Sequence, residues 1–418
     1  MRFHVRLNHE GFYSEHQNLK RFKRGIPTQH TVSSIDKNIR KIRCCKTAGH
    51  FTQAPVFLSY LLGYSMHLKQ NLLLLTTCAL IIGLPCHSAD AQTPATESFS
   101  GLTFQSPAEK SIGKKIVLIA AEQEYRSEQS MPMLAKILSS RHGFDCTVLF
   151  AVNPQGQVDP TMPVSPEKGK ESEFQTHNIP GLDRLKEADL VIFFARLLTL
   201  PLEQQKQIVS YIDSGKPIIG LRTANHGFRG RLPYKIDGKQ IQFGEQVLGG
   251  TFRGHHGNWH RDSTRGDIVD AMKDHPILTG VANIWGPSDV YRTFPENGAL
   301  PSNCTALVYG QPLIGREQGG ESNPNKIPLP VIWTKPWKTS NGKLARVFHS
   351  TMGSGKDFEN EGFRRCIVNA CYWCTQLEDQ IPPQSDVSYV DPYTPLSSGF
   401  NYEKLGVTPK MPTEYRTP

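Results

Sequence analysis

Short apolar runs alternate with amphipathic stretches between residues 115 and 221 of this 418-residue chain. Four runs are almost continuously apolar: Lys115–Ala121, Cys146–Val152, Ala188–Ala195 and Pro217–Leu221. Such runs are typical of strands that are buried on both faces of a parallel sheet. Between them, Met131–Arg141 and Glu203–Ser214 carry apolar residues at helical spacing. Strands that alternate with helices predict βαβ units with right-handed crossovers, and therefore an α/β fold.

The second half of the chain is less regular. Further strands are predicted at Thr305–Tyr309, Pro330–Thr334 and Arg346–Ser350, and a closing helix at Phe363–Leu377. The segment 229–300, whose first part is rich in Gly, His and Arg, is expected to form a rim over the strand ends. We therefore predict one α/β domain over residues 113–380. A linker at 92–112 precedes it, and a Pro-rich tail at 381–418 follows it and runs over the surface.

The residues before the linker have the pattern of an export signal. A charged segment, Met66–Gln70, precedes the apolar run Asn71–Leu84, and Ser88–Ala91 supplies the small residues of a signal peptidase site. Because the run is too short for a comfortable membrane span, we predict a cleaved signal peptide at 66–91, an exported protein (periplasmic or extracellular) and no stable membrane anchor. Residues 1–65 would place this signal inside the chain, so we expect Met66 to be the true start. A genuine basic arm is the alternative.

The basic character of the chain comes from this front end. Residues 1–91 hold 12 of the 47 basic and 4 of the 38 acidic residues, so the formal net charge falls from +9 to +1 without them. No later segment has a basic stripe interleaved with aromatic residues. We therefore expect no nucleic-acid partner.

Polar residues directly follow the predicted strand Pro217–Leu221. In open α/β sheets, ligands bind just beyond the carboxyl ends of the strands. Four polar residues would stand at that place: Arg222, Thr223, Asn225 and His226. A permanently charged guanidinium needs solvent, a carboxylate or a ligand anion. We therefore expect Arg222 to bind the ligand, with Glu122 or Asp289 as its partner in the empty site, and Arg222→Ala to leave the fold nearly as stable. An ordinary strand-to-helix loop is the alternative.

Histidines form the densest group of candidate chemical residues. His255, His256 and His260 lie within six residues of one another, His226 follows the predicted strand Pro217–Leu221, and His349 stands near the end of another predicted strand. Neutral imidazole is the commonest metal ligand and the usual proton carrier near neutral pH. Three interpretations stay open. They are a metal-free polar site for a polyhydroxylated or anionic ligand, a divalent metal held by the three clustered histidines, and a solvated loop.

Four carboxylates are expected at the same rim: Glu122, Glu124, Asp289 and Asp357. Asp289, two residues before Tyr291, could orient a histidine or accept sugar hydroxyls, and an Asx-turn cap is the alternative. Asp357 follows a Gly-Ser-Gly-Lys segment whose spacing does not match a Walker loop. Capping the helix that follows is the preferred interpretation for Asp357.

Several motifs, taken in order, resemble those of the ThuA-like (trehalose utilisation) family. They are Gly215–Leu221, Leu248–Phe252, His275–Ile277, Asp289–Tyr291 and Arg346–Phe348 leading into Thr351–Gly353. The resemblance covers residues 115–380 and implies a three-layer domain with a mostly parallel sheet, similar to the class I glutamine amidotransferase and flavodoxin-like folds. Many relatives have histidine where Arg222 stands, and Gly-His where Gly353-Ser354 stands, so roles of those histidines cannot be carried over. The turn at Arg222 also lacks the cysteine of an amidotransferase, which argues against glutaminase activity.

The resemblance implies a substrate class, and the residues suggest a site. We expect an exported enzyme that acts on a sugar or an oxidised sugar derivative, as a hydrolase, lyase or isomerase. The catalytic candidates are His255, His256, His260 and Asp289. The ligand-binding candidates are Glu122, Arg222, Thr223, Asn225, His226, Tyr291 and His349. No cofactor is certain, although a divalent metal is possible. The alternative function is a non-catalytic module that binds a carbohydrate-like small molecule at the same rim.

Overall fold

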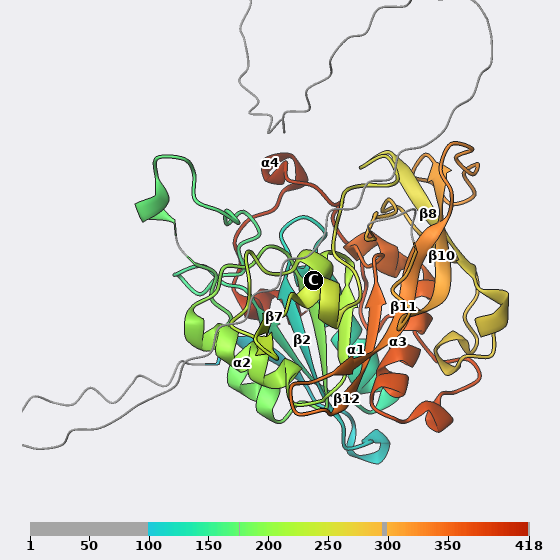
Figure 1. Cartoon of the computed structure of the whole chain (residues 1–418), viewed down its shortest axis with the longest axis horizontal. Coiled ribbons are helices and arrows are strands. Elements are labelled where there is room, and N and C mark those ends of the chain that lie inside the picture. Colours follow the sequence, from blue (N-terminus) through green and yellow to red (C-terminus); the bar gives the residue numbers. More distant parts are fainter. Residues whose placement is uncertain (1–98, 175, 295–298, 417–418) are drawn as a thin grey trace, which may run out of the picture. The chain divides into compact units, whose positions relative to one another are not determined.

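The computed structural model of the chain describes residues 99–174, 176–294 and 299–416 (Figure 1). The predicted signal peptide at 66–91 and the extension 1–65 lie outside these residues. Among the described helices, none combines the length and the apolar character that a membrane span needs.

A ten-stranded mixed sheet runs through the described part of the chain. Its strands are β1 (Gly101–Phe104), β2 (Lys115–Ala121), β3 (Asp145–Phe150), β4 (Leu190–Ala195), β5 (Ile218–Leu221), β8 (Asp262–Ile268), β9 (Ile284–Gly286), β10 (Thr305–Ile314), β11 (Leu329–Lys338) and β12 (Leu344–Ser350). Their order across the sheet is β1-β3-β2-β4-β5-β12-β11-β10-β8-β9. A separate hairpin consists of β6 (Lys235–Ile236) and β7 (Lys239–Gln240).

The centre of the sheet is parallel, as its apolar strands predict. β3, β2, β4, β5 and β12 pair in parallel, and their order corresponds to the 2-1-3-4-5 order of flavodoxin-like domains. Successive side chains of β2 enter two different cores, since Ile116 and Leu118 pack on one face and Val117 and Ile119 on the other. This two-sided burial explains why the strand is apolar at every position after Lys115. The remaining strands extend the sheet by antiparallel pairing.

Helices cover both faces of the parallel strands (Figure 1). α1 (Ser127–His142) and α3 (Glu361–Cys374) pack on the face that holds Leu118, and α2 (Leu202–Ile212) packs on the opposite face. The predicted α/β class is therefore confirmed, with a three-layer arrangement around a parallel core. α1 begins four residues before the predicted helix. Its first turn escapes the helical pattern because it is polar yet buried at the strand ends, as Ser127 and Glu128 show.

Two predicted segments differ from the structure. Part of the predicted linker is a strand, because β1 pairs with β3 and buries Leu102 and Phe104. The predicted rim at 229–300 adds β8 and β9 to the sheet. β8 has no apolar pattern to reveal it, since its buried side chains include the small polar residues Ser263 and Thr264.

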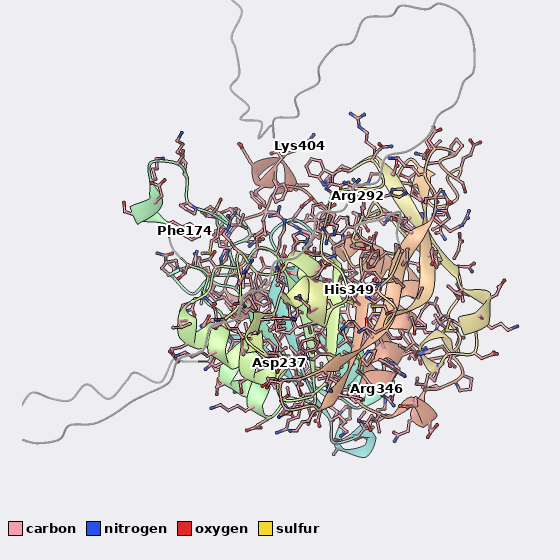
Figure 2. All side chains as sticks on the ribbon, in the orientation of Figure 1. Phe174, Asp237, Arg292, Arg346, His349 and Lys404 are labelled. Carbon is pink, nitrogen blue, oxygen red and sulfur yellow. The ribbon has the colours of Figure 1, made fainter. Side chains whose placement is uncertain are left out.

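The C-terminal tail lies on the side of the sheet where the parallel strands end. In Figure 2, β12 ascends from Arg346 to His349, and Lys404 lies beyond His349 at the top. Lys404 belongs to the short helix α4 (Tyr402–Leu405) of the tail. The tail is anchored rather than loose, because Tyr393 and Tyr415 are buried. It therefore belongs to the surroundings of any site at this edge.

Candidate functional site

Polar residues follow the carboxyl ends of the parallel strands. Glu122 and Glu124 come after β2, Arg196 comes after β4, and Arg222–His226 form a 3-10 turn after β5. β2 and β4 are neighbours in the sheet, and between them the chain order changes direction. Ligands bind at this point in open α/β sheets. The geometry therefore places the candidate site at this edge.

Backbone strain is concentrated at the same edge. Seven non-glycine residues in the described part of the chain have positive φ, and four of them lie here: Arg126, Leu197, Arg222 and His260. For residues with a Cβ atom, such a conformation costs on the order of 1 kcal/mol or more. Surrounding contacts must hold these residues in place, which is common at functional sites.

His255 and Asp289 form a histidine–carboxylate pair. Nδ1 of His255 lies 2.7 Å from Oδ2 of Asp289, so the ring donates this proton and leaves Nε2 available. The His255 side chain is partly exposed, whereas that of Asp289 is buried. Burial alone would raise the pKa of Asp289, but the hydrogen bond from His255 and the charge of Arg222 outweigh it and lower this pKa. The carboxylate is therefore charged and can stabilise a protonated His255.

Arg222 holds Asp289 from beneath the edge. Its guanidinium donates to Oδ1 of Asp289 at 3.0 Å, and to the backbone carbonyls of Asp289 and Thr351 at 2.7 and 2.8 Å. The rings of Tyr291 and Tyr125 lie 3.7 and 4.5 Å from its central carbon. The side chain has no exposed surface. The expected pairing with Asp289 is present. The expectation that Arg222→Ala leaves the fold nearly as stable must be revised, because these buried contacts would be lost.

A second histidine–carboxylate pair is built on Glu124. Its Oε1 accepts hydrogen bonds from Nε2 of His260 at 3.1 Å and from Nε1 of Trp259 at 3.0 Å. Nε of Arg196 lies 3.9 Å from the other oxygen, Oε2. Burial raises the pKa of Glu124, but the hydrogen bond from His260 and the charge of Arg196 outweigh it and lower this pKa. Glu124 is therefore a buried, ionised carboxylate that positions an imidazole and an indole.

Glu122 has a different protonation behaviour from Glu124. It is 3% exposed and accepts hydrogen bonds from the backbone amides of Glu124 and Tyr125. Burial and the charge of Glu124 raise the pKa of Glu122 to about 7. Glu122 can therefore hold or release a proton near neutral pH while Glu124 stays ionised.

Aromatic rings connect the two pairs. The centroid of the His255 ring lies 5.2 Å from that of Phe252, 5.4 Å from Tyr291 and 5.8 Å from Trp259. Trp259 is edge-on to His260 at 4.3 Å, and 46% of its surface is exposed. The exposed indole of Trp259, with polar groups on either side, suits a ligand that has both C–H faces and hydroxyl groups. We refer to six residues together as the strand-end site: Glu124, Arg196, His255, Trp259, His260 and Asp289.

Comparisons with known proteins show the family of this chain. A family model described as "Trehalose utilisation" matches residues 116–374. The chain belongs to the ThuA (trehalose utilisation) family. Among solved structures, the ThuA chain is similar to a ThuA-like protein from Bacteroides uniformis, with 16% identity, a TM-score of 0.41, and coverage of 66% of this chain and 97% of that chain. It is also similar to one from Parabacteroides merdae, with 15% identity, a TM-score of 0.37, and coverage of 73% and 99%. A comparison with curated proteins finds no match.

Family membership confirms the resemblance drawn from the motifs, and it supports a domain related to carbohydrate utilisation. Sequence reasoning missed Arg196 and Trp259 as parts of the site in this ThuA domain. Arg196 directly follows the apolar run of β4, which is the same signal that pointed to Arg222 after β5. Glu124 was expected at the rim, but nothing in its local sequence indicated which histidine it would hold.

The ThuA fold places other predicted residues away from the strand-end site. Nε2 of His256 lies 2.8 Å from the carbonyl oxygen of Ile327, so this ring turns away from its neighbour His255. His349 is buried within β12, and its Nδ1 donates to the carbonyl of Gly220 at 2.8 Å. Burial lowers the pKa of His349 to about 3, so the ring is neutral at physiological pH.

The turn after β5 is mostly buried. Thr223 and Asn225 have almost no exposed surface, as is true of Tyr291 beneath the edge. Nδ1 of His226 lies 2.6 Å from Oδ1 of Asn225. Burial, followed by the charges of Arg196 and Arg222, lowers the pKa of His226 to about 3. Thr223, Asn225, His226 and Tyr291 are therefore uncharged side chains that pack beneath the strand-end site.

A metal centre built from the three clustered histidines does not match the geometry. His255 and His260 pair with different carboxylates, and His256 faces a backbone carbonyl. Within residues 99–174, 176–294 and 299–416, no group of three or more His, Cys, Asp or Glu side chains is arranged to hold a metal ion. The three histidines therefore do not act as one ligand set.

The sequence favours Asp357 as the cap of the helix that follows, but Asn360 caps α3, and Asp357 lies inside a short 3-10 helix before it. Its carboxylate accepts hydrogen bonds from the amides of Gly353 and Ser354 at 2.8 and 2.9 Å, and Ser354 and Asp357 form a capping box for the 3-10 helix Gly355–Glu359. It also accepts from the amide of Ser288 at 3.1 Å. Asp357 thus ties the loop that carries Asp289 to the turn after β12.

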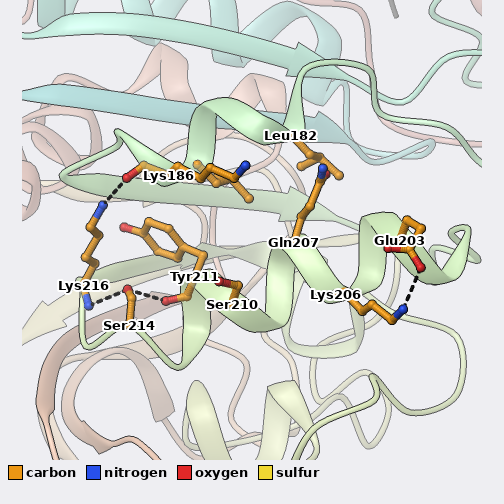
Figure 3. Close-up of a pocket in the computed structure, with 10 residues that line it drawn as sticks. Leu182, Lys186, Glu203, Lys206, Gln207, Ser210, Tyr211, Ser214 and Lys216 are labelled. Carbon is orange, nitrogen blue, oxygen red and sulfur yellow. Dashed lines mark hydrogen bonds and ion pairs between the residues drawn. The ribbon is translucent and has the colours of Figure 1, made fainter. Parts of the chain in front are cut away.

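A separate hollow lies between α2 and the 3-10 turn Leu182–Lys186 (Figure 3). Its volume is about 460 Å³. Two of its three lysines are bonded within the protein, since Nζ of Lys206 pairs with Glu203 at 2.6 Å and Nζ of Lys216 donates to the carbonyl of Lys186 at 2.8 Å. No histidine lines it. The strand-end site is therefore the better candidate for chemistry.

Proposed function

We propose that this ThuA-family protein binds a sugar or an oxidised sugar derivative at the strand-end site and transfers protons to and from it. One observation carries the proposal. Two accessible imidazoles are held by two buried carboxylates, His255 by Asp289 and His260 by Glu124, with the exposed Trp259 between them. Orientation by a carboxylate is what a catalytic imidazole needs. The family description supports the carbohydrate class of the ligand.

In this proposal His255 is the general base. Its Nε2 takes a proton from a hydroxyl group, or from a carbon next to a carbonyl group, and the buried Asp289 stabilises the imidazolium that forms. Arg222 keeps Asp289 ionised and in place. His260, held by Glu124, returns a proton at another position of the ring that packs on Trp259. Such a division of roles fits a lyase, isomerase or hydrolase reaction.

A non-catalytic binding module is the second candidate. The observation that favours it is the state of Arg222, which is buried and bonded to Asp289 at the position where many relatives have histidine. A binding module would use the same exposed surface around Trp259. The affinity of such a module for a sugar would depend on the residues around Trp259, but the module would not convert the sugar to a product.

Variants of two neighbouring histidines separate these candidates. Glucose, trehalose and glucuronate serve as probes, with binding followed by thermal shift and conversion by proton NMR. If the protein is an enzyme, His255→Asn should lower turnover by about 100-fold or more while the thermal shift persists. His256→Asn is the matched control, because that ring faces the carbonyl of Ile327, and it should behave as wild type. Binding without conversion by the wild type would favour the module, and no thermal shift with any probe would contradict the proposal.

We also propose that the protein is exported. The support is the predicted signal peptide at 66–91, which lies outside the described residues. N-terminal sequencing of protein from its native cells should find Gln92 as the first residue. A peptide from residues 1–65 would contradict this proposal.

A further inference from the structure

The C-terminal tail is anchored on both sides of α4. Before α4, the hydroxyl of Tyr393 donates to the carbonyl of Gly355 at 2.8 Å. The amide of Leu396 donates to a side-chain oxygen of α1 at 2.9 Å. After α4, Lys410 and Val158 exchange two backbone hydrogen bonds of 2.7 and 3.1 Å. The residues between these anchors therefore have a fixed place on the domain.

The middle of this segment contacts the strand-end site. The amide of Gly399 donates to the carbonyl of Glu124 at 3.0 Å. Gly399 has a φ of +140°, and a Cβ atom there would lie 3.7 Å from Cε1 of His260. The ring of the next residue, Phe400, lies 5.0 Å from the central carbon of Arg196. The tail thus contacts the backbone of Glu124, the residue whose carboxylate holds His260, and the side chain of Arg196.

Phe400 is exposed, unlike the aromatic residues that anchor the tail. It is 40% exposed, compared with 8% for Tyr393 and 6% for Tyr415. Trp259, at 46%, is the other exposed ring beside Glu124. Trp259 donates a hydrogen bond to Oε1 of this carboxylate. Arg196, whose guanidinium packs on the ring of Phe400, faces Oε2. Two exposed rings therefore flank one buried carboxylate.

We propose that Phe400 and Trp259 form two aromatic walls of the ligand site, so that the C-terminal tail sets the affinity for the sugar. The inference rests on the proposed function, because it assigns a contact residue to the same site. A sugar ring has C–H faces that pack on aromatic rings, and hydroxyl edges that bond to charged groups. Glu124 and Arg196 supply the charged groups between the two walls.

Calorimetric titration of the full chain with glucose, trehalose and glucuronate tests this inference. For a probe that binds the wild type, Phe400→Ala should raise the dissociation constant by about tenfold, the scale of a lost aromatic contact. Phe400→Leu, which keeps apolar volume but has no aromatic face, should resemble it, and Phe400→Tyr should stay within about twofold of wild type. Phe99→Ala is the matched control. Phe99 is 37% exposed and lies 4.0 Å from the central carbon of Arg184 in the turn Leu182–Lys186.

The outcomes separate this inference from the proposed function. If Trp259→Ala loses binding while Phe400→Ala and Phe400→Leu bind as wild type, the inference is overturned and the proposed function stands. If the wild-type chain binds none of the three sugars, both are overturned. A Phe400→Ala variant that fails to fold is replaced by Phe400→Leu, and wild-type affinity in that variant counts equally against the inference.

Discussion

Arg222→Ala should remove a large part of the stability of the ThuA domain, although Arg222 lies beneath a candidate site. The substitution deletes the bonds to Asp289, Thr351 and Tyr125, and it removes the cation that lies between Tyr125 and Tyr291. Asp289 would stay behind as a buried carboxylate, since only 2% of its side chain is exposed.

The expected cost follows from three overlapping effects. Removing one partner of a buried ion pair costs about 3–5 kcal/mol, because the other charge loses its compensation. Each carbonyl that loses its donor adds about 1 kcal/mol, and the cavity left by truncation adds about 2 kcal/mol. Because these effects share atoms, we expect a total of about 4–6 kcal/mol rather than their sum. That is a large share of the roughly 5–15 kcal/mol that stabilises a typical domain.

Urea unfolding of the purified chain, followed by tryptophan fluorescence, measures this cost. Arg222→Met keeps much of the volume and should still lose about 3 kcal/mol or more. Adding Asp289→Asn to Arg222→Met should cost about 2 kcal/mol less than the two single losses together, because no unpaired charge is left. Arg346→Ala is the control: Arg346 lies at the other end of β12 and pairs with Glu378 at 2.9 Å, with side chains 35% and 28% exposed. It should lose about 1 kcal/mol or less.

A wild-type urea midpoint for Arg222→Ala would refute this reasoning. If that variant unfolded normally but bound its ligand about 2 kcal/mol more weakly, Arg222 would be a direct ligand contact, as first expected from the sequence. Strictly additive losses in the double variant would show that Arg222 and Asp289 do not act as a pair.

Two further predictions concern buried carboxylates. Asp357→Ala should lower the free energy of unfolding by about 3 kcal/mol, because the amides that it bonds at Gly353, Ser354 and Ser288 lose their acceptor. Asp270→Ala, at an exposed position, is the control and should change the free energy of unfolding little. Equal losses of stability in the two variants would contradict the role of Asp357 in the capping box. Glu122 has a pKa of about 7 in the folded chain, above its ordinary value of 4.5, so the folded state binds more protons than the unfolded state between these values. Relative to Glu122→Gln, the wild type should therefore have its full stability below pH 4.5 and lose about 3 kcal/mol as pH rises from there to 7. Melting temperatures that differ by a constant amount from pH 5 to pH 8 would contradict this.

The sequence by itself determined the parallel core and the edge at which the candidate site lies. β2 after Lys115, β4 and β5 are continuously apolar because both of their faces are buried, and this pattern can be recognised in the sequence alone. The polar residues that follow them had to lie at one edge, because parallel strands end on the same side of a sheet. β8 was not readable in this way, since it fills its buried positions with small polar side chains.

Only the tertiary structure decided which residues at this edge meet. His255 and His256 are adjacent in the sequence, yet one pairs with Asp289 and the other faces the carbonyl of Ile327. The position of Arg222 directly after a strand is compatible with an exposed side chain. In the structure, Asp289 and two tyrosines from other segments enclose it. Periodicity along a chain reports how each element is buried, and it carries no record of contacts between distant segments. Whether a charged side chain such as Arg222 is exposed to a ligand or buried beneath the site therefore depends on how distant segments pack together.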